Sequence, residues 1–141
     1  PSFRGAGRKE PRSGNLDRIQ IVNGWVGQDG ERNVQVYAVG WGDADIRKPG
    51  RNGKSPAVGN TVNVKEANWT NTIGDPELIG VWKDPDFDPA LPAVYYARVI
   101  EIPTPRWTAF DAKKYGVTMP KEAEMITQER AYTSPIWYTP N

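Results

Sequence analysis

The feature that most constrains the fold is a ten-residue segment, AVYYARVIEI, at residues 93–102. It is almost continuously apolar and is rich in valine, isoleucine and tyrosine, which favour strands. Apolar runs of about 18 residues are needed to suggest a membrane span, and no run in the sequence approaches that length. A short apolar run of this kind is typical of a strand that is covered on both faces. We therefore expect residues 94–102 to form the central strand of a sheet.

Two earlier segments alternate between apolar and polar residues, which is the period of a strand. They are residues 17–26, DRIQIVNGWV, and residues 32–41, RNVQVYAVGW. The Asp29-Gly30 pair between them is a common hairpin turn. The pattern predicts a β-hairpin that spans residues 17–41.

The rest of the chain adds strands and one helix. Strand patterning is also present at residues 61–71, 77–84 and 128–139. In the last of these, Pro135 indicates an edge or a bulge. Thr108 is a candidate N-cap for a helix at residues 109–115, with Asp111 at the capping-box position. Gly116 is a natural place for that helix to end.

About six strands separated by turns, with one short helix, predict a mostly β protein. The expected architecture is an antiparallel β-sandwich of the immunoglobulin-like kind. A length of 141 residues fits one domain, given the usual ~100–200 residues per domain. We assign the sandwich to residues 17–141. Residues 1–16 are rich in glycine, arginine and proline, and their composition indicates a linker or arm.

The composition excludes several classes of function. The chain has no cysteine and no histidine, so zinc sites of the usual Cys/His kind and histidine-based catalysis are impossible. A net charge of +1 argues against a dedicated nucleic-acid binder, which needs a strongly positive surface. No signal peptide is visible, and the chain begins with proline. We expect it to be part of a larger protein.

The segment DPDFDP places carboxylates at alternate positions, Asp84, Asp86 and Asp88. This spacing resembles the start of an EF-hand calcium loop. The sixth position is Pro89 instead of glycine, and the twelfth is Tyr95 instead of glutamate. The prolines favour extended geometry in the preceding residues. We expect no cofactor and interpret the segment as an ordered corner, with a calcium site as the weaker alternative.

Six tryptophans are many for a chain of this length. Trp25 and Trp82 lie in strand-like contexts, which favours packing, whereas Trp69 and Trp107 lie at the ends of elements and are candidates for exposure. Exposed tryptophans, with the basic loop at residues 47–54, would suit a glycan or an acidic polymer. Packing or a protein interface is the favoured interpretation, because tryptophan alone specifies no ligand. Residues 68–70, NWT, also match the N-glycosylation sequon.

Paired carboxylates could in principle support glycosidase chemistry. Glu101 lies near Arg98 and Arg106 in the sequence, and Asp17 adjoins Arg18. Carboxylates that pair with arginine inside a protein are more often structural than catalytic. We therefore predict no catalytic residue in this chain and keep an autonomous enzyme as a remote alternative.

Three stretches together resemble the C-terminal end of an uncharacterised bacterial family. They are GNLDRIQIVNGWV at residues 14–26, VWKDPDFDPALPAVYYARVIEIPTPRWTAFDA at residues 81–112 and QERAYTSPIWYTP at residues 128–140. Members of this family are several times longer and usually exported. They are similar to the PHP (polymerase and histidinol phosphatase) metal-dependent hydrolases. The similarity also extends upstream of Asp17, which implies that residues 1–16 include part of a first strand.

The resemblance implies a non-catalytic accessory domain. In PHP-like proteins the metal ligands belong to the preceding catalytic barrel, and none can be carried over to a chain without histidine. The expected partner is that upstream domain, and the expected location is periplasmic or secreted. Candidate interface residues are Trp82, Phe87, Arg106 and Trp107.

Overall fold

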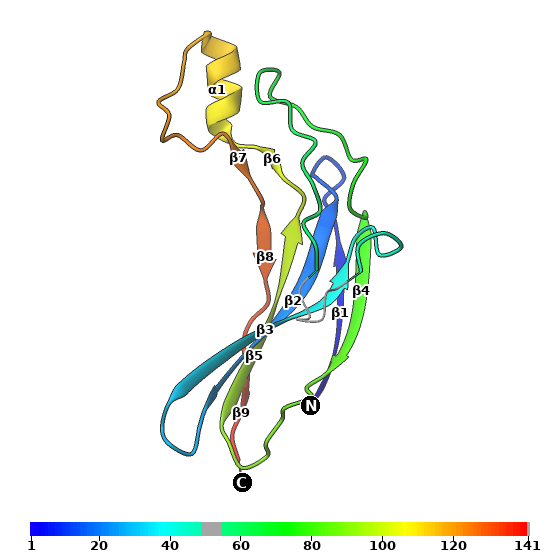
Figure 1. Cartoon of the computed structure of the whole chain (residues 1–141), viewed down its shortest axis with the longest axis vertical. Helices are drawn as coiled ribbons and strands as arrows, with labels where there is room; N and C mark the ends of the chain where they lie inside the picture. The colour runs from blue at the N-terminus through cyan, green and yellow to red at the C-terminus, as the bar shows by residue number, and fades with distance from the viewer. Residues whose placement is uncertain (49–54, 141) are drawn as a thin grey trace.

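A computed structural model describes residues 1–48 and 55–140 of the chain (Figure 1). It is a mostly antiparallel β structure with one short helix, as predicted. The elements, in chain order, are β1 (Ser2–Arg8), β2 (Leu16–Val26), β3 (Arg32–Trp41), β4 (Glu77–Lys83), β5 (Ala93–Glu101), β6 (Thr104–Pro105), α1 (Trp107–Tyr115), β7 (Ile126–Thr127), β8 (Arg130–Tyr132) and β9 (Ile136–Tyr138).

The larger sheet has the order β3-β2-β5-β8, and β9 also pairs with β5. All of these pairings are antiparallel. Strand β5 therefore has β2 on one side and β8 and β9 on the other, which confirms the prediction of a central strand at residues 94–102. The expected hairpin is also confirmed: β2 pairs with β3, and Gly30 takes a left-handed conformation in the turn with φ of 83°.

The smaller sheet consists of β1 and β4, paired antiparallel over the whole length of β1. The composition-based prediction of an arm is thus wrong for residues 2–8, and the alternative of a first strand holds. Glycines on the inner face explain both the strand and its misleading composition. A Cβ on Gly7 would lie 3.2 Å from a methyl group of Val99, and one on Gly5 would lie 3.8 Å from Ile19. The two sheets can approach closely at Gly7 because this position carries no side chain, whereas a Cβ on Gly5 would make only an ordinary contact.

Strands β6 and β7 pair antiparallel as a separate two-stranded sheet. The core lies between the β1–β4 sheet and the five-stranded sheet. One cluster joins Leu16 and Ile19 of β2 to Leu78 of β4. A second cluster consists of Ile21, Ala93 and Tyr95. Six partly buried apolar side chains pack against it: Phe3, Trp25, Val39, Trp82, Ala97 and Tyr138. Because both clusters draw on β2 and reach β1 or β4, the architecture is a β-sandwich with five strands facing two.

Residues 61–71 do not form the strand that the alternation predicts. They contain a turn closed by one isolated bridge between Asn63 and Asn68, and Ala67 has a left-handed φ of 46°. The Asn63 side chain also accepts a hydrogen bond from the Glu66 N–H at 3.1 Å. Such a local bond offers the backbone an alternative to a sheet ladder.

The helix is present but begins earlier than predicted. Its N-cap is Arg106, whose side chain makes no capping bond, and Gly116 ends it with φ of 63°, as expected. Thr108 lies within the helix, and its hydroxyl donates to the Glu124 carbonyl instead of capping the helix. Asp111 therefore has no capping-box role. The expected final strand at residues 128–139 is divided into β8 and β9, with Pro135 between them.

Helix α1 lies at one end of the molecule, and the two chain termini lie at the other (Figure 1). Its only buried residues are Thr108 and Ala109. Trp107, Phe110 and Tyr115 are 63%, 47% and 64% exposed. No helix in the described part of the chain combines the length and apolar character needed to cross a membrane.

Candidate functional site

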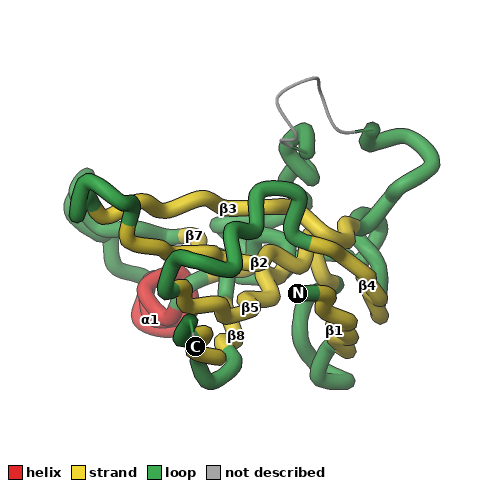
Figure 2. Tube along the Cα trace, turned by 90° about the horizontal axis from the view of Figure 1, so that it is seen from below, coloured by secondary structure: helices red, strands yellow, loops and turns green. Residues whose placement is uncertain are grey.

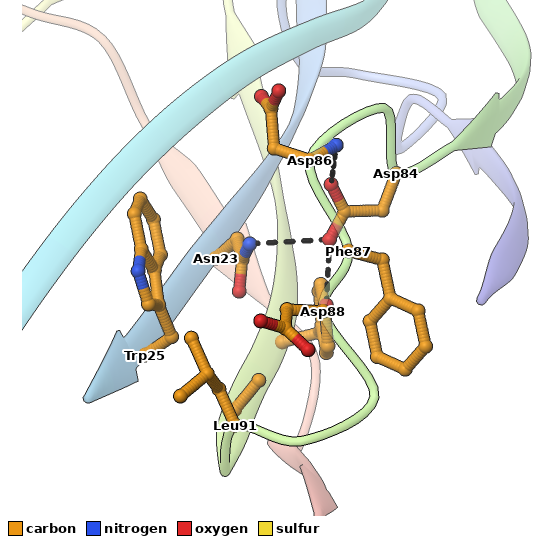
Figure 3. A pocket seen from close by; sticks show the side chains of 9 residues that line it. Asn23, Trp25, Asp84, Asp86, Phe87, Asp88 and Leu91 are labelled. Atoms are coloured by element: carbon orange, nitrogen blue, oxygen red, sulfur yellow. Dashed lines mark hydrogen bonds between the residues drawn. The ribbon is translucent and has the colours of Figure 1, made fainter. Parts of the chain in front are cut away.

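The segment DPDFDP follows β4 and turns back towards β5. Asp84 is 5% exposed, and both of its oxygens accept hydrogen bonds from the protein (Figure 3). Oδ2 accepts from the Tyr95 hydroxyl at 2.6 Å and from Asn23 Nδ2 at 3.2 Å. Oδ1 accepts from the Asp86 N–H at 3.0 Å. Asp84 is thus the centre of a hydrogen-bond cluster that ties the loop to β2 and β5.

Two tyrosine hydroxyls donate hydrogen bonds to the aspartates of this loop. The Tyr37 hydroxyl on β3 donates to Asp86 Oδ2 at 3.1 Å. Burial first, and then the hydrogen bond and charge of Asp86, raise the pKa of Tyr37 to about 12. Burial, followed by the hydrogen bond to Asp84, also raises the pKa of Tyr95 well above its ordinary value. Both phenols therefore remain protonated donors around neutral pH.

The same loop contains two tight local turns. Asp84 accepts from the N–H two residues later, and Asp88 Oδ1 accepts from the Ala90 N–H at 2.8 Å. Bonds from an aspartate to the backbone two residues on define Asx turns. The arrangement is the ordered corner that we expected. Within the residues described, no group of three or more His, Cys, Asp or Glu side chains is placed to hold a metal ion.

A small hollow lies beside Asp84. It is lined by Asn23, Trp25, Asp84, Asp86, Phe87, Asp88, Leu91, Ala93 and Tyr95, and its volume is about 20 Å³. This is enough for one water, which needs about 10–15 Å³, but pockets for small molecules measure roughly 300–1,000 Å³. Asn23 Oδ1 is buried and has no hydrogen-bond partner. The hollow therefore suits a single water-sized donor and does not accommodate a substrate.

Two of the candidate interface residues pack inside this chain. Trp82 is half-buried, stacks on Phe3 with ring centroids 5.9 Å apart, and lies 4.6 Å from the Tyr37 ring. Phe87 is half-buried and meets the Tyr138 ring edge-on at 5.0 Å. Their aromatic surface is largely used by neighbours of the same chain.

The remaining candidates lie away from this cluster. Arg106 forms an ion pair with Glu124 at 2.7 Å. Trp69 is half-buried, whereas Trp107 on α1 is exposed. Trp137 on β9 is 74% exposed, but α1 and β9 lie at opposite ends of the molecule (Figure 1). These two exposed tryptophans cannot form one flat platform of the kind that would hold a sugar.

A second buried polar centre involves Arg47. Its Nη2 donates to Asp17 Oδ1 at 2.7 Å and to the Pro56 carbonyl at 2.7 Å. Its Nε donates to Pro56, and its Nη1 donates to the carbonyls of Asp17 and Gly42. All five guanidinium donors are therefore engaged inside the protein. The hypothesis that the 47–54 loop binds a polymer is wrong for Arg47; Lys48 is exposed, and Arg51 and Lys54 lie outside the described residues.

The carboxylates of Asp17 and Glu101 also bind side chains of the same protein. Asp17 pairs with Arg18, as expected, and additionally accepts from Gln128 Nε2 at 3.2 Å. Among the described residues, Glu101 forms no ion pair with Arg98 or Arg106, and its carboxylate accepts from the Ser13 hydroxyl. Arg98 instead donates to Gln20 at 2.7 Å.

The family assignment comes from a comparison with protein-family models. The model described as "Protein of unknown function (DUF3604)" matches residues 1–140. The chain belongs to this family. The match agrees with the resemblance to an uncharacterised family, and it includes residues 1–16. Neither the curated proteins nor the solved structures gave a match.

In this DUF3604 chain, sequence reasoning found the loop but missed the residues that hold it. Asn23 lies in a strand where alternation assigns no polar role, yet it is only 4% exposed. Tyr37 and Tyr95 lie in strands as ordinary β-forming residues, and nothing local indicates that their hydroxyls meet aspartates. The only available signal was the requirement that a buried tyrosine hydroxyl finds a partner.

Proposed function

We propose that this DUF3604 chain is a non-catalytic accessory module that packs on another domain of a longer, exported protein. In this proposal the other domain is a PHP-like metal-dependent hydrolase, and the module positions or walls its cleft. Three features of the described residues support a role without chemistry. The buried carboxylates are engaged by protein donors, the hollow beside them is water-sized, and the arginine of the basic loop is internal.

One observation carries the proposal: three aromatic side chains of α1 remain largely exposed in the described structure, and the one cation near them is the Lys114 ammonium, 5.2 Å from the centroid of the Tyr115 ring. Trp107, Phe110 and Tyr115 are about half to two-thirds exposed on a nine-residue helix. Aromatic side chains offer roughly 150–250 Å² each, so the three expose on the order of 300 Å² of surface. The largest apolar patch on a typical monomer is about 300–600 Å² and is often functional. A helix that buries so little of its own surface is explained by docking on a second domain.

The decisive experiment compares the same substitutions in two settings. Trp107→Ser with Phe110→Ser is made in this chain and in the longer family protein that contains it, with Lys114→Ser as an exposed control on the same helix. We expect the double variant to leave the Tm of this chain nearly unchanged, because those side chains pack against little. In the longer protein it should lower the Tm and accelerate proteolysis between the domains.

Equal effects in the two settings would contradict the docking proposal. A separate assay tests the absence of chemistry in this chain. We expect no turnover of p-nitrophenyl phosphate or p-nitrophenyl acetate after addition of Mn²⁺ or Zn²⁺. Turnover that persists after repeated purification would overturn the non-catalytic assignment.

A further inference from the structure

The two sheets of the sandwich are unequal, and their mismatch leaves a groove. Strand β1 has β4 on one side, and its other side faces β5 and β8 (Figure 2). Ile136 of β9 lines the same side. Two adjoining hollows of about 380 and 280 Å³ lie there, and they share Ala97 and Thr133. Residues 3–8 of β1 line them in unbroken succession. The groove thus follows the whole free side of β1.

The backbone of β1 offers hydrogen-bonding groups to this groove. At the two ends of the β1–β4 ladder, the Lys9 N–H donates to Pro76 and the Asp84 N–H donates to Pro1, which identifies the odd-numbered residues of β1 as the hydrogen-bonded pairs. In an antiparallel ladder the intervening residues direct N–H and C=O to the opposite edge. Among the described residues these edge groups have no backbone partner. They belong to Ser2, Arg4, Ala6 and Arg8.

The side chains around the groove define what could pair with that edge. Its floor is mostly apolar and includes Leu16, Ile21, Tyr95, Ala97 and Val99. Its charged lining consists of three arginines, Arg4, Arg8 and Arg130, and two glutamates, Glu101 and Glu129. The side chains of Arg4 and Arg8 point outward, and neither forms an ion pair within the described part of the chain. Successive residues of an added strand would face the floor and the solvent in turn. Inward positions therefore suit apolar residues, and outward positions beside the arginines suit acidic ones.

The β1 strand of a second copy offers these arginines no acidic partner, because β1 contains no acidic residue. Antiparallel pairing of two β1 strands centred on Ala6 would place Arg4 of one copy opposite Arg8 of the other. Like charges directly opposite each other destabilise a strand pair. An acidic segment from a different polypeptide would gain from the same two arginines.

We propose that the free edge of β1 binds an extended segment of another polypeptide, with alternating acidic and apolar residues, by strand addition. The main-chain bonds to Arg4, Ala6 and Arg8 would supply the affinity, and the apolar floor and the arginines would select the sequence. The added strand would lie over β5 and β8 and would become the third strand of the β1–β4 sheet. The surface is separate from α1, so this inference does not depend on the proposed docking of the helix.

The test uses a capped heptapeptide of alternating glutamate and valine as the probe, with a lysine-for-glutamate peptide as its charge control. We expect saturable binding of the acidic peptide, slower hydrogen exchange at the amides of Arg4, Ala6 and Arg8, and weaker binding of the basic peptide. Ala6→Pro removes only an edge N–H that β4 does not use, so the fold should tolerate it. It should weaken binding by about tenfold or more, whereas Ala6→Thr, which keeps the N–H, should leave binding nearly unchanged.

Several results would overturn the proposal. Equal affinity of the Ala6→Pro and Ala6→Thr variants would do so, provided that both retain the parent Tm. Peptide-induced protection confined to other strands would place the site elsewhere. Protection of the β1 amides that increases with protein concentration, without peptide, would identify a second copy as the occupant.

Discussion

The buried pair between Arg47 and Asp17 gives the clearest quantitative prediction. The Arg47 side chain is 6% exposed and the Asp17 side chain 1%. In the variant Arg47→Met, which keeps the length and loses the charge, Asp17 retains only Arg18 and Gln128 as side-chain partners. The carbonyls of Gly42 and Pro56, which accept from the guanidinium, lose those bonds as well.

The expected cost follows from these contacts. Removing one partner of a buried ion pair typically costs about 3–5 kcal/mol, and retention of Arg18 places the ionic part near the lower limit. Each stranded carbonyl adds about 1 kcal/mol where water does not reach it. We expect Arg47→Met to lower the free energy of unfolding by about 4 kcal/mol. For a chain of this size that corresponds to a fall in Tm of roughly 10–15 °C.

Urea unfolding followed by tryptophan fluorescence measures this change, with Lys48→Met as the matched control. Lys48 is the exposed neighbour, and its replacement should alter the free energy by no more than about 0.5 kcal/mol. The double variant Asp17→Asn with Arg47→Met should be less destabilised than the sum of the single variants, because no buried charge is left unpaired. A loss below about 1 kcal/mol for Arg47→Met, or simple additivity in the double variant, would refute the reasoning.

Three further predictions concern the corner, Tyr37, and a pair of glycines with positive φ. Asp84→Ala leaves the buried donors of Tyr95 and Asn23 without an acceptor, so it should lower the free energy of unfolding in urea by about 2–4 kcal/mol. The control Asp88→Ala, at an exposed position, should lower it by less than about 1 kcal/mol. Equal losses would show that Asp84 is not the centre of the cluster. The folded state holds the Tyr37 proton more tightly than the unfolded state, since its pKa rises from 10.0 to about 12, so this contribution to stability is complete below pH 10 and is lost as pH rises towards 12. Unfolding free energies measured from pH 8 to 12 should fall less steeply for Tyr37→Phe, and parallel curves would contradict the assignment. At Gly74, φ is 68° and a new Cβ would lie 2.6 Å from the Leu16 carbonyl oxygen. Gly74→Ala should therefore lower the free energy of unfolding, measured by calorimetry, by more than about 2 kcal/mol, because it adds a steric clash to the strain of a left-handed residue. Gly30 has a similar φ of 83°, but no atom lies within 4 Å of a new Cβ. Gly30→Ala should therefore lower the free energy of unfolding by only about 1–2 kcal/mol. A loss as large as that of Gly74→Ala would indicate that backbone strain, without the clash, accounts for both.

The sequence predicted the elements whose evidence is local. Alternation and the Asp29-Gly30 turn were sufficient for the β2–β3 hairpin, and the continuous apolar run was sufficient to make β5 central. Gly116 ended the helix as expected. The two aspartates at 84 and 88 formed Asx turns, as an ordered corner requires. In the hairpin, the helix end and the Asx turns, the deciding interactions join residues that are near in the sequence. For β5 the composition of the strand was enough, although its partners β2, β8 and β9 are distant in the sequence.

Predictions failed where a distant contact overrode the local pattern. Residues 2–8 have the composition of a linker but form β1. The glycine at position 7 leaves room for Val99 of the opposite sheet, where a Cβ would lie only 3.2 Å from its methyl group. Residues 61–71 alternate like a strand but are closed into a turn by the side chain of Asn63. Glu101 has arginines nearby in the sequence, yet its partner is Ser13, 88 positions away. Partners at such separations leave no trace in a window of ten residues.

The position of β5 has a consequence for the order in which the chain can mature during synthesis. β5 lies between β2, which precedes it, and β8 and β9, which supply its second neighbour. Residues 130–138 are therefore translated after most of the sheet already exists. Until they arrive, the outer edge of the most apolar strand is unpaired, and such edges recruit other chains. Translation pauses or truncations between residues 101 and 130 should produce the nascent species with the greatest need of chaperones.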